Sequence, residues 1–153
     1  MMKNKYFIFF WLVVLTAASV VAYLKWQDSF PEYDDAFIDA NLSFRDSSEK
    51  ELAKRFLEYQ HYRSAHEFEK TYPMELPYFR YLRKFRHYKS EISTTNNDFN
   101  STLLSISHHH KYNAIVDVTY LYKKNNYTSH EQDRWIRVNG EWYHAYRFSP
   151  FPE

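Results

Sequence analysis

The sequence contains no cysteine and only one glycine, Gly140. Without cysteine the chain cannot form disulfides, cysteine zinc sites, iron–sulfur centres or a thiol nucleophile. Phosphate-cradling and dinucleotide-binding loops each require several closely spaced glycines, so a single glycine excludes both kinds of loop. The composition therefore excludes thiol enzymes and the common nucleotide-binding enzymes.

Acidic side chains are absent from the first 27 positions. All 19 Asp and Glu residues come later, whereas three of the 20 basic residues, Lys3, Lys5 and Lys25, lie within that stretch. Residues 27–153 therefore carry 17 basic against 19 acidic side chains, a net charge of −2. A domain this close to neutrality is not expected to bind nucleic acid.

The longest hydrophobic run, Tyr6–Leu24, contains no charged residue. Its 19 residues would rise about 28 Å as a helix, close to the hydrocarbon thickness of a bilayer. By the positive-inside rule, Lys3 and Lys5 place the N-terminus in the cytoplasm. We therefore expect residues 1–26 to be a membrane anchor, either a signal-anchor or an uncleaved signal, in a single-pass protein.

This anchor would place the rest of the chain outside the cytoplasm, in the periplasm if the source is bacterial. Residues 27–47 would be an acidic connector, for which a solvated spacer is the preferred interpretation. Residues 48–153 would be the extracytoplasmic domain. Small residues in the run also allow cleavage of a signal peptide near Ser19 or Tyr23, which would instead give a secreted soluble protein.

Two helices are expected at the start of the domain. Ser48 and Glu51 have capping-box spacing, which predicts a helix over residues 49–71. Pro77 suits the first position of a second helix, over residues 77–89, because its missing N–H has no helical partner there.

The second helix separates aromatic from basic side chains. At 100° per residue the two kinds of side chain form opposite stripes. We expect the aromatic stripe to be buried and the basic stripe to face an acidic protein surface, anionic lipid or simply solvent. The aromatic stripe is Tyr78, Tyr81, Leu82, Phe85 and Tyr88, and the basic stripe, the candidate interaction surface, is Arg80, Arg83, Lys84 and His87.

From residue 92 onward the pattern changes from helix to strand. Asn139-Gly140 is the strongest short signal for a two-residue β-hairpin, and this turn would pair Trp135 with His144. Helices followed by a four- to five-stranded antiparallel meander define an α+β fold. The expected strands are residues 99–108, 112–122, 132–138 and 141–148.

The nine hairpin residues Trp135–Tyr143 resemble the end of the nuclear transport factor 2-like (cystatin-like α+β) superfamily. Its members often end in a strand, a tight turn with glycine and a strand with tryptophan, and the resemblance covers about residues 48–148. It implies helices packed on a meander. Members with one membrane helix are assembly subunits of bacterial secretion machines, whereas others are enzymes or ligand-binding proteins. The enzymes use a cavity Asp–His or Asp–Tyr arrangement that does not map onto this sequence.

Three residues on the expected strands are pocket candidates: Asp117, His144 and Tyr146. Asp117 lies mid-strand between valines, and a buried carboxylate is costly without a partner, so it indicates either a functional site or a partly wet sheet face. His108 and His110 would point to the same face of a strand and are weak candidates for metal ligands. His144 or Asp117 would complete that site, and a polar turn is the alternative.

The sequence contains no complete catalytic motif, and no cofactor is expected. Abundant Tyr, Trp and Arg suit protein interfaces. We therefore expect a non-enzymatic interaction or assembly module of an envelope complex, attached to the membrane and bound to a protein partner or to further copies of itself. The alternative is a small-ligand-binding or enzymatic pocket between helix and sheet.

Overall fold

The computed structural model describes residues 13–20, 29–95 and 98–145. The chain divides into two compact units, Met1–Phe30 and Pro31–Glu153. The second unit contains the predicted strands and helices of the domain.

The expectation of a membrane-spanning helix is corrected by the structure. Residues 13–20 are helical and exposed. The rest of Tyr6–Leu24 lies outside the described residues. Across residues 13–20, 29–95 and 98–145, no helix is long and apolar enough to cross a membrane, which overturns the single-pass, extracytoplasmic localisation.

Each of the two predicted helices of the domain is divided. In place of the first lie α2 (Ser47–Ser64), α3 (Phe68–Thr71) and the 3-10 turn η1 (Tyr72–Met74). In place of the second lie α4 (Pro77–Leu82) and α5 (Phe85–Ser93), and α5 includes Ile92, where the sequence pattern indicated strand.

The N-terminus of α2 is capped two residues earlier than predicted. Asp46 is the N-cap, and its Oδ1 accepts a hydrogen bond from the Glu49 N–H at 3.0 Å. The Glu49 carboxylate in turn accepts from the Arg45 N–H at 2.6 Å. Asp46 and Glu49 therefore take the capping roles that were expected of Ser48 and Glu51.

α2 ends in a left-handed residue rather than continuing to Thr71. His66 has φ 59°, and the N–H of Glu67 donates to Tyr62 O at 2.8 Å while the N–H of His66 donates to Arg63 O at 3.2 Å. This pair of bonds is a Schellman motif with His66 at the position that glycine usually occupies. It turns the chain so that α3 leaves α2 in a new direction.

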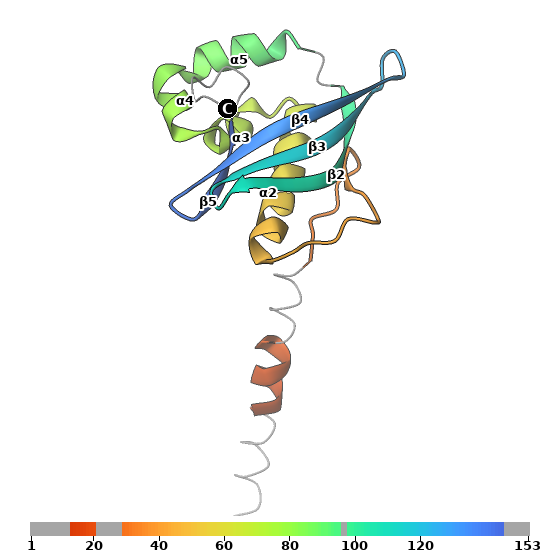
Figure 1. The fold of residues 1–153 in the computed structure, drawn as a ribbon, viewed down its shortest axis with the longest axis vertical. Helices are drawn as coiled ribbons and strands as arrows, with labels where there is room; N and C mark the ends of the chain where they lie inside the picture. Colours follow the sequence, from red (N-terminus) through yellow and green to blue (C-terminus); the bar gives the residue numbers. More distant parts are fainter. Residues whose placement is uncertain (1–12, 21–28, 96–97, 146–153) are drawn as a thin grey trace, which may run out of the picture. The chain divides into compact units, whose positions relative to one another are not determined.

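The second unit is an α+β fold on one five-stranded mixed sheet (Figure 1). Strands β2–β5 form the antiparallel meander that the sequence predicts. β1 pairs in parallel with β2, so the expectation of a purely antiparallel sheet is wrong. Parallel neighbours need a long crossover connection, which α2–α5 supply here. In spatial order the strands are β1 (Ala36–Ile38), β2 (Phe99–His110), β3 (Asn113–Tyr122), β4 (Tyr127–Val138) and β5 (Glu141–Ala145).

β1 lies in the segment that was expected to be an acidic spacer. The Ser101 N–H donates to Asp35 O at 2.8 Å, and the Asp39 N–H donates to Leu103 O at 2.9 Å, so backbone hydrogen bonds to β2 hold both ends of the strand. The Asp35 carboxylate also binds α2, since it lies 2.9 Å from His61 Nδ1 and accepts from the Ser64 hydroxyl. This part of the connector is therefore a docked strand, and the spacer interpretation is wrong for it.

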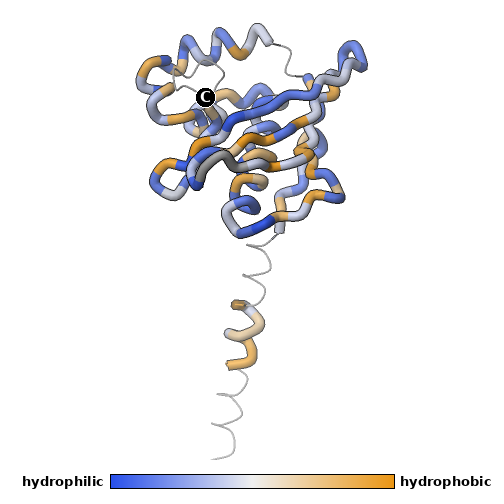
Figure 2. Tube along the Cα trace, viewed as in Figure 1, coloured by the Kyte–Doolittle hydropathy of each residue, from blue (hydrophilic) through white to orange (hydrophobic). Residues whose placement is uncertain are grey.

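α2 lies across one face of the sheet and forms the main core with it (Figure 1). Along β3, buried residues alternate with more exposed ones. Figure 2 shows that hydrophobic positions occur on both the strands and the helices, interspersed with hydrophilic ones. The inner face of the sheet presents Phe99, Ser101, Leu103, Ala114, Val116, Val118, Tyr120, Asp133, Trp135, Trp142 and His144 to α2.

A second layer covers part of the opposite face of the sheet. Ile136, Val138 and Tyr143 alternate with the inward-facing tryptophans of the hairpin and therefore lie on the outer face. They pack against a buried cluster from the α3–α5 segment. The cluster consists of Phe68, Leu76, Phe79, Tyr88 and Ile92.

The hairpin register predicted from Asn139-Gly140 is confirmed. Both turn residues have positive φ, 53° and 93°, as a two-residue hairpin of the primed type requires. Trp135 pairs with His144, as expected.

Candidate functional site

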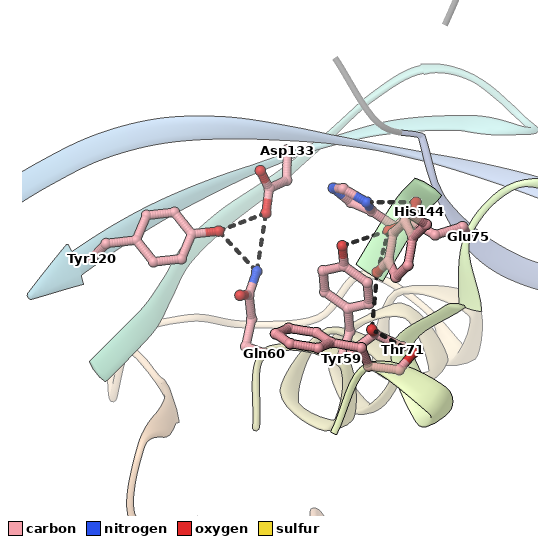
Figure 3. A network of polar contacts seen from close by, with 9 residues as sticks. Tyr59, Gln60, Thr71, Glu75, Tyr120, Asp133 and His144 are labelled. Carbon is pink, nitrogen blue, oxygen red and sulfur yellow. Dashed lines mark hydrogen bonds and ion pairs between the residues drawn. The ribbon is translucent and has the colours of Figure 1, made fainter. Parts of the chain in front are cut away.

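A buried carboxylate, Glu75, gathers three hydrogen-bonding side chains in the core (Figure 3). Glu75 is 0% exposed. Its Oε1 accepts from the Tyr59 hydroxyl at 2.7 Å and lies 3.1 Å from the Tyr88 hydroxyl, which is also 2.9 Å from Thr71 Oγ1. Its Oε2 lies 3.0 Å from His144 Nδ1. We call these five residues the Glu75 cluster.

Local backbone geometry directs Glu75 inward. Glu75 follows η1 in an extended conformation and pairs with His144 in an isolated parallel bridge. The next N–H, of Leu76, donates to His144 O at 2.9 Å. The short segment therefore adds to the edge of β5, and Pro73 and Pro77 on either side disfavour its incorporation into one continuous helix.

A second buried carboxylate, Asp133 of β4, lies on the same face of the sheet. Asp133 Oδ2 accepts from the Tyr120 hydroxyl at 2.8 Å and from Gln60 Nε2 at 3.0 Å, and Gln60 Nε2 also donates to the Tyr120 oxygen at 2.8 Å (Figure 3). The Arg63 guanidinium lies 5.9 Å from the Tyr120 ring centroid, so a cation adjoins this triad.

The two carboxylates perturb the titration of their neighbours. Burial lowers the pKa of His144, but the charge of Glu75 and its hydrogen bond outweigh burial and raise that pKa above its ordinary value. Burial, followed by the negative charge of Glu75, raises the pKa of Tyr59. Burial and Asp133 likewise raise the pKa of Tyr120. The phenols therefore stay neutral donors, and the protonated form of His144 is favoured.

Two polar atoms beside these groups have no hydrogen-bond partner among the described residues. They are Trp135 Nε1 and Gln60 Oε1, both in fully buried residues. The Trp135 ring packs edge-on against the rings of Tyr59 and His144, with 5.6 and 5.5 Å between ring centroids. A buried donor and a buried acceptor thus remain available in the core.

The two predicted pocket residues that the structure describes, His144 and Asp117, lie on opposite faces of the sheet. His144 lies in the Glu75 cluster. Asp117 lies on the outer face, where Ser105 and, at 2.8 Å, Gln132 Nε2 donate to its carboxylate. Of the two interpretations of Asp117, the structure agrees with the partly wet sheet face, because the neighbouring valines occupy the inner positions of β3 and Asp117 lies on the other side. Tyr146 lies outside the described residues.

The structure gives no support to a metal centre within its described part. His108 and His110 fall on β2, but their side chains lie outside the described residues. In the described ranges, no group of three His, Cys, Asp or Glu side chains could hold a metal ion.

The aromatic and basic stripes of the predicted second helix are not segregated as expected. Tyr81, Leu82 and Tyr78 are 76%, 55% and 46% exposed, whereas Tyr88 is buried. Phe79, outside the predicted aromatic stripe, is the α4 residue in the core. The break between α4 and α5 changes the direction of the chain, so one stripe cannot run through both.

The four predicted interaction residues have different surroundings. The Arg80 guanidinium is partly buried, 5.9 Å from the Tyr143 ring centroid. Arg83 forms an ion pair with Glu91. Lys84 and His87 are exposed.

Sequence reasoning missed both buried carboxylates. Glu75 stands between the apolar Met74 and Leu76 in a segment bounded by prolines, which is an informative position for an acid. Asp133 follows the alternation of its strand toward the inner face, two residues before Trp135. Glu75 lies between the two predicted helices, where no periodicity marks its direction, whereas Asp133 lies in the predicted strand 132–138, on the face of Trp135.

No family model and no curated protein matches the chain. Among solved structures, the chain is similar to a SEC-C motif containing protein from Rhodopseudomonas palustris, at 14% identity and a TM-score of 0.49, over 71% of this chain and 92% of that one. It is also similar to a SEC-C motif containing protein from Psychrobacter arcticus, at 14% identity and a TM-score of 0.48, over 74% and 67% of the two chains.

Proposed function

We propose that residues 31–153 form a non-enzymatic protein-interaction module. The observation that carries this proposal is the exposed face of α4, formed by Tyr78, Tyr81 and Leu82 and called here the α4 surface. These residues follow i, i+3, i+4 spacing, so they share one side of the helix, while Phe79 anchors the other side in the core. Exposed aromatic and large apolar side chains that cluster on a rigid element are typical of interfaces.

The polar core supports a structural role for the buried acids. Both oxygens of Glu75 and Oδ2 of Asp133 have protein donors, and the space between α2 and the sheet is filled by large, fully buried side chains. Buried carboxylates that are hydrogen-bonded in this way favour one packing arrangement of the elements that supply the donors. It also holds β5 and η1 together, and α4 follows directly from η1.

The proposal is tested with the double substitution Tyr81→Ser/Leu82→Ser. Because both side chains are exposed, stability should change little, whereas recovery of a partner by quantitative affinity purification from the native source should fall at least about tenfold. Tyr127→Ser removes a similarly exposed aromatic residue at the start of β4 and serves as the control. Equal recovery with the double variant and with the control would contradict the proposal.

A second candidate function is a small-ligand or acid–base site at the Glu75 cluster. The unpartnered Trp135 Nε1 and Gln60 Oε1 favour it, together with the raised pKa of His144. A bound small molecule would satisfy both atoms. Trp135 indole and Gln60 amide resonances that do not shift across a small-molecule fragment screen would eliminate this candidate.

The resemblance to the nuclear transport factor 2-like superfamily remains a prediction. The order of helices before a meander, and the final hairpin with Trp135 and Trp142 on its inner face, support it.

A further inference from the structure

We propose that the α4 surface binds an amphipathic segment of another protein whose apolar anchors are flanked by acidic residues. This inference rests on the proposed function and specifies the chemistry of the partner. It depends on the apolar α4 surface and on the positive charge that follows it in the chain.

The segment that carries the α4 surface is strongly basic in a domain that is otherwise slightly acidic. Residues 77–93 contain five Lys and Arg residues against a single acid, Glu91. Most of the remaining charge of the domain is therefore negative, and the positive field is concentrated at α4–α5. Such an uneven distribution steers a partner of opposite charge to one place.

The structure distinguishes the cations that are engaged within the fold from those that remain available. Arg83 is paired with Glu91, and Lys89 lies 2.8 Å from Glu69. Lys84 and Arg86 are exposed and make no ion pair within the described residues. These two cations are the ones that a partner can neutralise without breaking an existing contact.

The connection between α4 and α5 is held in place, so its cations are presented in a fixed arrangement. The Tyr72 hydroxyl donates to the backbone oxygen of Arg83 at 2.8 Å, and its ring packs against Phe85 at 5.4 Å. Lys84 and Arg86 adjoin this anchored point. Rigid presentation lowers the entropic cost of binding.

An acidic partner fits better than a second copy of the chain. In a two-fold dimer the same patch meets itself, so Lys84 and Arg86 of one copy would oppose the same cations of the other. An acidic amphipathic segment satisfies both features, because its apolar anchors cover Tyr81 and Leu82 while its carboxylates approach the basic residues.

The test uses the full-length, isotope-labelled chain and three synthetic helical peptides. The first peptide has Leu and Phe at i, i+3, i+4 and i+7 with Glu elsewhere, the second replaces each Glu with Lys, and the third replaces the apolar residues of the first with Ser. The acidic amphipathic peptide should shift amide resonances of residues 78–87, and its affinity should fall at least about tenfold between 50 and 500 mM salt.

Charge-reversing substitutions then test whether Lys84 and Arg86 contribute to peptide binding. Lys84→Glu/Arg86→Glu should weaken binding of the acidic amphipathic peptide at least about tenfold. The control is the same charge change in the turn between β3 and β4, Lys123→Glu/Lys124→Glu, which should leave binding unchanged. Equal binding of the acidic and basic peptides at α4 would overturn the acidic-partner inference and leave the interaction module standing. No peptide binding at α4 would contradict both. A concentration-dependent dimer that Tyr81→Ser dissociates would also overturn the inference, because the occupant would then be a second copy.

Discussion

At the scale of single residues, Glu75 has the greatest influence on the core. Its carboxylate joins α2 through Tyr59, α5 through Tyr88 and β5 through His144. A buried carboxylate of this kind is tolerated because each group that contacts it can donate a hydrogen bond. Removing one residue of the cluster leaves the polar groups of the other residues buried without that partner. The Glu75 cluster is therefore a structural junction between three elements.

Glu75→Gln should destabilise the fold by about 2–4 kcal/mol. The amide has almost the same shape but cannot accept as strongly from three donors, and it removes the negative charge beside His144. Urea denaturation gives the free energy of unfolding. Glu69→Gln, at an exposed carboxylate that pairs with Lys89 on the surface, is the matched control and should have no measurable effect. Equal stability of the two variants would show that the negative charge of Glu75 does not contribute to the free energy of unfolding.

The raised pKa of His144 makes stability depend on pH. A histidine whose pKa is higher in the folded than in the unfolded chain binds its proton more tightly when folded. The contribution of His144 to the free energy of unfolding is complete below its pKa in the unfolded chain, about 6.5, and is lost as pH rises through its pKa in the folded chain. The free energy of unfolding should therefore decline as pH rises above about 6.5. His144→Asn should abolish this part of the decline, and an unchanged slope in that variant would assign it to another group.

At the scale of elements, helix ends depend on single backbone positions. His66 occupies the left-handed site of the Schellman motif, a conformation that costs a residue with a Cβ roughly 1 kcal/mol relative to glycine. His66→Gly should accordingly stabilise the fold by about 0.5–1 kcal/mol, measured by urea denaturation. Ala65→Gly is the paired control, because Ala65 has a right-handed φ of −75° and its replacement should destabilise. A loss of stability in His66→Gly would mean that the imidazole contact with Phe68 matters more than the backbone.

The β4–β5 hairpin depends on Gly140 for backbone conformation and not for space. A Cβ at Gly140 would meet nothing within 4 Å, but φ is 93°, which a β-branched residue adopts only under strain. Gly140→Val should therefore destabilise by roughly 1–3 kcal/mol in thermal or urea denaturation. Asn139→Gly, at the other positive-φ position, should be neutral or stabilising. A neutral Gly140→Val would show that the turn relaxes to another type without cost.

At the scale of the whole molecule, the sheet and its covering helices bury several phenols together. Burial is the first cause of the raised pKa of Tyr59, Tyr120 and Tyr88, followed by the nearby carboxylates. These hydroxyls belong to α2, β3 and α5, so they report on the integrity of the entire fold rather than of one element.

The free energy of unfolding should therefore fall steeply with pH in the alkaline range. A tyrosine in the unfolded chain loses its proton near pH 10, whereas the buried tyrosines of the folded chain keep theirs. The contribution of these buried tyrosines to stability is therefore complete below about pH 10 and is lost as pH rises above it. Three such groups give a slope of at most about 4 kcal/mol per pH unit. Unfolding followed by tryptophan fluorescence should coincide with the phenolate absorbance of the buried class. Tyr59→Phe should reduce the slope by about a third. A slope that does not change would show that Tyr59 ionises within the folded state.

Local chemistry by itself determined the α+β class and the last hairpin. Asn139-Gly140 adopts positive φ without help from distant residues, and the two-residue turn then fixes which residues of β4 and β5 face each other. The alternation of β3 is similarly local, since a period of two follows from strand geometry. For the same reason Trp135 and His144 could be placed opposite each other from the sequence.

Only the tertiary structure decided which face of each element is buried and which distant acids meet. Asp117 and Asp133 both lie on alternating strands, but α2 covers the face of Asp133. The parallel pairing of β1 depends on the crossover through α2–α5, and no local signal specifies it. Glu75 and His144 are 69 residues apart, and their contact exists because η1 places Glu75 at the edge of β5. The exposure of Tyr81 likewise depends on the break between α4 and α5, since hydrophobic periodicity identifies a stripe but not the surface that covers it.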